Sequence, residues 1–171
     1  MSTLLALSPD HKAKIFNPSP LPSQEEVAKI PWGTVTWLIV NQGEARELHY
    51  LISGEIKEKE IPIRELIRRL SNIAAGVGVV CTLGADGVLA YLPSSHRPEA
   101  ANDTQRCLYV PAAKIQGPVR DTTGAGDCFT GYFVQGLMEF GAQSEITERD
   151  LEKVLKRCVV VSGTILIYDM H

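Results

Sequence analysis

The sequence lacks the features that define several large classes of protein. Its longest apolar runs are too short, or too often interrupted by glycine, to cross a bilayer, and its first residues do not have the basic-then-apolar order of a signal peptide. The formal net charge is only -3 over 171 residues, so no basic excess favours nucleic acid. These absences predict a cytoplasmic protein that binds neither membranes nor nucleic acid.

The four cysteines lack the close spacing that two kinds of site require. Cys81, Cys107, Cys128 and Cys158 form no CxxC pair, and no histidine stands near any of them in the sequence. This spacing suggests neither a zinc site nor a disulfide framework. Cys128 stands close to the start of a predicted helix, where the thiol pKa is typically lowered. We nevertheless expect it, like the others, to have no catalytic role.

The apolar patterning that is present predicts strands alternating with helices. Runs rich in β-branched residues predict strands at residues 13–16, 35–40, 77–82, 88–92 and 108–110. Capping signals and helical spacing predict helices that begin near Ser23, cover residues 43–52 and 124–140, extend from residue 63 to near Gly76, and begin again near Thr147. The alternation favours a parallel sheet covered by helices in one domain, and "ADG" at residues 85–87 predicts one antiparallel hairpin.

The stretch "RDTTGAGDCFTGYFVQGL", residues 120–137, places two glycines at the start of a predicted helix. Glycine costs about 1 kcal/mol relative to alanine inside a helix, which argues that something approaches this backbone closely. Gly124 and Gly126 can adopt positive φ, and without Cβ atoms they let backbone N–H groups reach a phosphate. The positive end of the helix dipole favours the same ligand.

Asp127 follows these glycines and would repel a bound anion. Its position makes sense if its carboxylate orients a neutral hydroxyl group and accepts its proton as that group attacks a phosphoryl group. Alternatively, Asp127 only complements the helix dipole, a gain of about 0.3–1 kcal/mol. The residue types alone leave both interpretations open.

Known phosphate loops are absent: there is no GxxxxGK[ST], and no third glycine completes a dinucleotide fingerprint. Instead, "DTTGAGDCFTGYF" at residues 121–133 resembles the carboxyl-terminal signature of the ribokinase (PfkB) family of carbohydrate kinases. Three further stretches resemble family motifs in the same order: "FNPSP" at 16–20, "NQGEA" at 41–45 and "TLGADG" at 82–87. The resemblance implies a ribokinase-like three-layer α/β/α fold with a mostly parallel sheet.

The resemblance also implies roles for individual residues. Asp127 matches the catalytic base, and Gly124, Ala125 and Gly126 match the anion hole for the transferred phosphoryl group. The remaining matches concern cofactors: Asn41 and Glu44 would organise Mg²⁺ and phosphate, largely through water; Thr82, Gly84, Asp86 and Gly87 would lie along ATP; Asp121 and Thr123 would bind a monovalent cation such as K⁺. Three alternatives remain open: residues 41 and 44 only cap a helix, residues 82–87 form only a hairpin turn, and residue 121 is only an N-cap.

The matched motifs cover only the carboxyl-terminal half to two-thirds of a typical family member. The amino-terminal strands, the sugar-binding motifs and the β-sheet lid have no counterpart, so we expect residues 1–171 to be one ribokinase-like domain that is a carboxyl-terminal fragment. The implied reaction is transfer of the γ-phosphoryl group of ATP to a sugar hydroxyl, with nucleotide and a small sugar as partners and a homodimer left open. The alternatives are a truncated, non-catalytic nucleotide-binding product or pseudokinase and, disfavoured by the missing fingerprint, a dinucleotide-dependent oxidoreductase.

Overall fold

A computed structural model gives the fold of residues 3–6, 13–54, 61–93, 107–113, 124–140 and 146–165. Its centre is a six-stranded sheet in the order β1-β2-β3-β4-β5-β6. The strands are β1 (Thr3–Ala6), β2 (Lys14–Asn17), β3 (Trp37–Asn41), β4 (Gly78–Thr82), β5 (Val88–Tyr91) and β6 (Cys107–Val110). Asp121 and Thr123, the predicted cation ligands, lie outside the described residues.

The sheet is mostly parallel in strand direction, as expected. β2 pairs with β3 and β3 with β4 in parallel, whereas the β1–β2, β4–β5 and β5–β6 pairs are antiparallel. Two successive reversals return β6 to the direction of β4, so β2, β3, β4 and β6 run one way and β1 and β5 the other. The β4–β5 pair is the hairpin that "ADG" predicted, closed where the Leu83 N–H donates to the Gly87 carbonyl at 2.8 Å.

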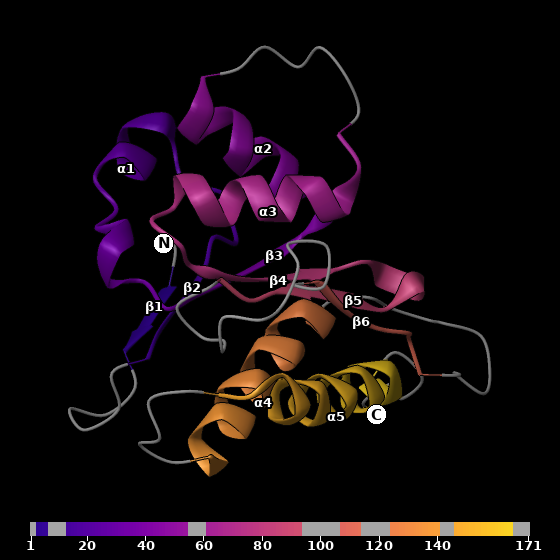
Figure 1. The fold of residues 1–171 in the computed structure, drawn as a ribbon. Coiled ribbons are helices and arrows are strands. Elements are labelled where there is room, and N and C mark those ends of the chain that lie inside the picture. Colours follow the sequence, from indigo (N-terminus) through magenta and orange to yellow (C-terminus); the bar gives the residue numbers. More distant parts are fainter. Residues whose placement is uncertain are drawn as a thin grey trace.

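Helices cover both faces of this sheet, which makes three layers (Figure 1). One face carries α1 (Gln24–Ala28), α2 (Gln42–Ser53) and α3 (Ile63–Ile73), and the other carries α4 (Ala125–Glu139) and α5 (Glu148–Ile165). Two 3-10 turns, η1 (Trp32–Thr34) and η2 (Gly84–Asp86), precede β3 and β5. None of the helices in the described ranges is both long and apolar enough to span a membrane.

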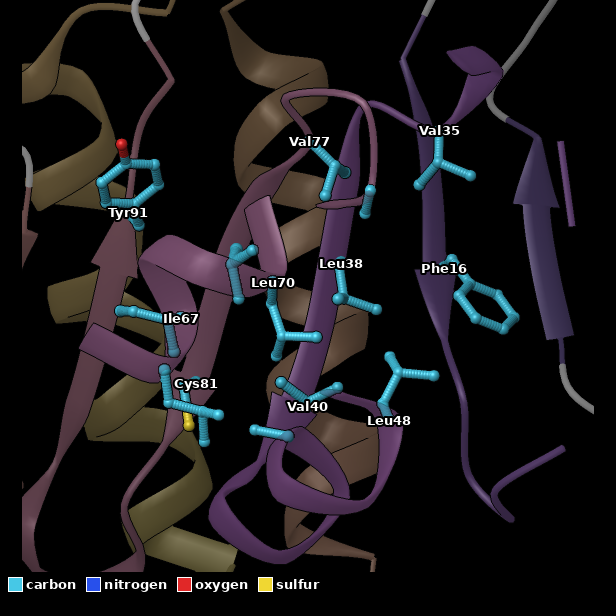
Figure 2. Packing of buried hydrophobic residues seen from close by; sticks show 14 of the residues in the cluster. Phe16, Val35, Leu38, Val40, Leu48, Ile67, Leu70, Val77, Cys81 and Tyr91 are labelled. Carbon is cyan, nitrogen blue, oxygen red and sulfur yellow. The ribbon is translucent and has the colours of Figure 1, made fainter. Parts of the chain in front are cut away.

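The apolar run of β3 is buried on both sides because the sheet has a helical layer on each face. Leu38 and Val40 pack with Leu48 of α2 and Leu70 of α3 in one core, which Figure 2 shows from close by. Trp37 points to the opposite core, where its ring meets that of Phe133 from α4 edge-on at 5.4 Å. The two cores therefore fix helices on both faces against the same strands.

Two details of the predicted elements differ. Residues 35 and 36, expected to open a strand, precede β3, because the 3-10 turn η1 runs to Thr34 and the strand begins at Trp37. β1 was not predicted at all. The carboxyl ends of β2, β3 and β4 lie along one edge of the sheet and carry Asn17, Asn41 and Thr82, so the polar residues that end these strands gather there.

Candidate functional site

The first turn of α4 is the centre of the candidate site. Gly124 is the N-cap residue and has φ +78° and ψ -6°, a left-handed conformation that glycine adopts without the strain a side chain would cause. The Cys128 N–H donates to the Gly124 carbonyl at 2.8 Å and closes the turn. The N–H groups of the first turn have no carbonyl partner within the helix and no side-chain cap from the described residues, so they suit an anionic ligand.

Gly126 does not use the positive φ that glycine permits, and it lies within regular helix. An added Cβ there would meet nothing within 4 Å in the described part of the chain. Neither backbone conformation nor packing against those residues therefore requires glycine at this position. A ligand that approaches the backbone closely remains a physical reason for glycine here.

Asp127 is exposed in the same turn. Within the described ranges, no hydrogen bond or ion pair occupies its carboxylate. The carboxylate is therefore open to solvent and to an incoming hydroxyl group, while its place in the first turn also suits the helix dipole. Both interpretations of Asp127 remain compatible with this geometry.

A chain of two hydrogen bonds joins this turn to the sheet. The Asn17 Nδ2 at the end of β2 donates to the Thr130 Oγ1 at 2.8 Å, and the Thr130 hydroxyl donates to the Gly126 carbonyl at 3.0 Å. Neither residue was predicted as a site residue. Asn17 falls inside the "FNPSP" stretch and ends an apolar strand, which is the only sequence signal that singles it out.

Asn41 and Glu44 form a reciprocal cap at the start of α2. The Glu44 N–H donates to the Asn41 Oδ1 at 2.8 Å, and the Asn41 N–H donates to the Glu44 Oε2 at the same distance. The capping interpretation of these residues is therefore realised. It leaves Glu44 Oε1 without a hydrogen bond from the described residues, so the carboxylate retains one oxygen for another ligand.

The turn between β4 and β5 holds the other predicted nucleotide contacts. Thr82 ends β4 opposite Asn41, Gly84 has φ +61°, and Gly87 has φ +101°. A Cβ on Gly87 would lie 2.2 Å from the Val110 carbonyl oxygen, so only glycine fits against the end of β6. The turn is thus a hairpin turn held in a defined shape.

Tyr109 of β6 holds the turn between β4 and β5 by a hydrogen bond from its side chain. Its hydroxyl donates to the backbone carbonyl of Asp86 at 2.6 Å, while the Asp86 residue itself stays exposed. Tyr109 was not predicted as part of the site, because nothing in the local sequence shows that β6 lies against residues 84–87.

Burial disfavours the thiolate form of three of the four cysteines. Burial raises the pKa of Cys81 to about 12, with the negative charge of Glu44 adding to it, and burial raises that of Cys158 to about 12. Burial also raises the pKa of Cys128. The expected lowering at a helix N-terminus is therefore wrong for Cys128, because partial desolvation disfavours the thiolate there.

The side chains of the described residues limit the kind of metal site that the chain can form. The described residues contain no group of three or more histidine, cysteine, aspartate or glutamate side chains able to hold an ion. Mg²⁺ commonly binds through one or two carboxylates, several waters and phosphate oxygens. The free oxygen of Glu44 fits that mode, whereas a closed protein cage for Mg²⁺ has no ligands within the described ranges.

The protein has an α/β/α fold, with a left-handed glycine at the start of α4 and an aspartate in the first turn of that helix. These features define an α/β protein with a candidate phosphate site at a helix N-terminus. Comparisons with known proteins identify its family. The pattern of the pfkB family carbohydrate kinases matches residues 4–166. The chain therefore belongs to this family.

Individual relatives agree with the family. A ribokinase of Lactococcus lactis subsp. lactis (strain IL1403) is 28% identical over 125 residues, which cover 73% of this chain and 32% of that protein. The crystal structure of a ribokinase from Cryptococcus neoformans var. grubii serotype A in complex with ADP has a TM-score of 0.68 and 36% identity, covering 91% of this chain and 47% of that one.

A Giardia lamblia ribokinase is similar in fold, with a TM-score of 0.65 and 23% identity, over 91% of this chain and 44% of that one. The chain thus spans slightly less than half of each of the two ribokinase structures, and about a third of the Lactococcus protein. The expected family and the three-layer fold are confirmed.

Proposed function

We propose that this chain binds the phosphates of ATP at residues 124–126 and serves ATP-dependent transfer of the γ-phosphoryl group to a sugar hydroxyl. Family membership supports phosphoryl transfer, and the related Cryptococcus ribokinase was crystallised with ADP. The observation that carries the proposal is Gly126, a helical glycine that the described surroundings do not require. Its missing side chain leaves the first-turn N–H groups accessible to phosphate oxygens.

Asp127 would act as the base in this reaction. Its carboxylate lies one residue after Gly126 and is not engaged by the described side chains, so a hydroxyl placed beside the bound phosphate can donate its proton to it. The N–H groups at the start of α4 would stabilise the charge that develops on the phosphoryl oxygens.

Mg²⁺ would supply positive charge that offsets part of the negative charge of the phosphates. Glu44 would hold it through water with the carboxylate oxygen that the helix cap leaves free, and Asn41 would keep Glu44 in position by the reciprocal cap. Asp121 and Thr123 stay proposed ligands of a monovalent cation. Thr82 and residues 84–87 would lie along the nucleotide.

Calorimetric titration with ATP and with adenosine tests the phosphate site. We expect ATP to bind more tightly than adenosine, and Gly126→Val to remove most of that difference while leaving adenosine affinity within about twofold. Gly33→Val is a matched control, because Gly33 also has no atom within 4 Å of an added Cβ in the described chain but lies in η1, away from α4. Equal ATP and adenosine affinities in the unmodified chain would contradict the proposal.

A second candidate is a non-catalytic nucleotide-binding member of the family. This candidate suits the observation that the 171 residues carry no counterpart of the family's sugar-binding motifs. A coupled ADP-release assay with ribose, Mg²⁺ and K⁺ separates the two when it is run on a fusion that supplies the amino-terminal half of a family member, because only the first candidate gives ribose-dependent turnover there. We expect the chain alone to give no ribose-dependent turnover, because holding the acceptor in line contributes about 7–11 kcal/mol to catalysis and no acceptor-binding motif was found in this sequence.

A further inference from the structure

The hydrogen bonds from Asn17 through Thr130 to Gly126 connect two elements that are far apart in the sequence. Asn17 ends β2, and Thr130 lies in α4, 113 residues later. We propose that Asn17 and Thr130 are positioning residues that fix the phosphate-binding turn of α4 against the carboxyl edge of the sheet. The inference rests on the proposed function for its ligand, but its geometry is independent of it.

The direction of each bond is determined. Thr130 has one hydroxyl hydrogen, and it points to the Gly126 carbonyl at 3.0 Å. Its oxygen must therefore accept from Asn17, which makes the donor Nδ2 and fixes the orientation of the amide. Thr130 is 5% exposed, so water competes little for either bond.

The Thr130 hydroxyl hydrogen does not need the Asn17 amide as a hydrogen-bond partner, and burying that amide costs free energy. The bond from Thr130 to the carbonyl four residues earlier already satisfies its hydroxyl hydrogen. Asn17 Oδ1 is buried and has no hydrogen-bond partner among the described residues. A leucine of similar size would avoid leaving this acceptor unpaired. What the asparagine adds is its bond to α4.

The bond between Asn17 and Thr130 holds the part of α4 that we propose binds phosphate. Thr130 lies one helical turn after Gly126 and is hydrogen-bonded to its carbonyl, so holding Thr130 also holds the peptide between Gly126 and Asp127. A turn held in place before the ligand arrives loses less freedom on binding. The sheet edge would thereby preorganise both the N–H groups of the turn and the Asp127 carboxylate.

Two variants remove the bond between Asn17 and Thr130 from opposite ends, so either one tests the inference if the other fails to fold. The variant at position 130 also removes the bond to the Gly126 carbonyl. Thr130→Val and Asn17→Leu keep size while removing the polar groups, and Thr130→Ser restores the hydroxyl. Ser71→Ala is the matched control, because its buried hydroxyl donates to the Val77 carbonyl at 2.7 Å on the other face of the sheet. Circular dichroism checks that each variant is folded.

The first readout is calorimetric titration with ATP and adenosine. Thr130→Val and Asn17→Leu should each weaken ATP binding about three- to tenfold, the range for one net hydrogen bond, with adenosine changed less than about twofold. The double variant should bind ATP no more weakly than Thr130→Val alone, because Thr130→Val already removes the bond to Asn17. Thr130→Ser and Ser71→Ala should stay within about twofold of the unmodified chain.

The second readout needs no ligand. Hydrogen exchange of the Cys128 amide, which closes the turn on the Gly124 carbonyl, should become about three- to tenfold faster in Thr130→Val and Asn17→Leu but not in Ser71→Ala. If exchange changes while no form of the chain binds ATP, the proposed function fails and the positioning role stands. Exchange in both variants equal to that in Ser71→Ala would overturn the inference.

Discussion

Replacing Gly87 by alanine measures how rigidly the fold holds the turn after β4. Gly87 has φ +101° and ψ -134°, a region that residues with a Cβ adopt at a cost of about 1–3 kcal/mol. The new Cβ would also lie 2.2 Å from the Val110 carbonyl oxygen and 2.6 Å from the Ala112 amide nitrogen. These are backbone atoms, so β6 and the residues after it must shift, which adds about 1–3 kcal/mol.

The expected loss for Gly87→Ala is therefore on the order of 2–6 kcal/mol of unfolding free energy, measured by urea denaturation followed by circular dichroism. Gly54→Ala is the control: Gly54 has φ +68° but no described atom within 4 Å of an added Cβ, so it should lose only about 1–2 kcal/mol. Gly84→Ala, at φ +61° in the same turn and equally open, should match the control. Equal losses at positions 54 and 87 would refute this account of the turn.

Three further predictions concern charge and chemistry. In a fusion that supplies the amino-terminal half of a family member, Asp127→Asn should lower turnover by about 10²–10⁴ without weakening ATP binding; near-normal turnover would reject it as the base. Hydrogen bonds from Arg68 and Arg69 lower the Glu65 pKa from 4.5 to about 2, so its stabilisation is complete above pH 4.5 and is lost as pH falls towards 2. Because the Glu65 carboxylate is one-third exposed, the loss of unfolding free energy on acidification should be only about 0.5–1 kcal/mol smaller in Glu65→Gln than in the unmodified chain. Urea denaturation at a series of pH values measures this difference, and the same pH dependence in both proteins would contradict the prediction. At pH 8 a thiol reagent should modify Cys81 and Cys158 only on unfolding, and labelling of either in the folded chain would disagree with their raised pKa.

Local patterns predicted the elements well. α3 begins at Ile63 as helical spacing indicated, since Leu66, Ile67 and Leu70 face one core, but it ends at Ile73 rather than near Gly76. β3 and β4 were recognisable because strands buried on both faces are continuously apolar. The hairpin after β4 followed from its turn residues, since Gly87 allows the positive φ that this turn requires.

Contacts between distant segments were not predictable in this way. The bond between Asn17 and Thr130 joins residues 113 positions apart, and no local pattern encodes it. Tyr109 meets the turn at Asp86 only because β6 pairs with β5. Of the two glycines that can adopt positive φ at the start of α4, only Gly124 does so, because the helix begins at Ala125. The roles inferred for residues 41, 44 and 82–87 stay predictions.

The most direct test of the central claim is a two-dimensional ¹H–¹⁵N spectrum of this chain titrated with ATP and, separately, with adenosine. The claim is that residues 124–126 bind phosphate through their backbone N–H groups at the start of α4. The amide signals of Gly124, Ala125 and Gly126 should then shift with ATP and remain in place with adenosine. Saturable ATP binding that leaves these three amides unmoved, or equal shifts with adenosine, would contradict the claim.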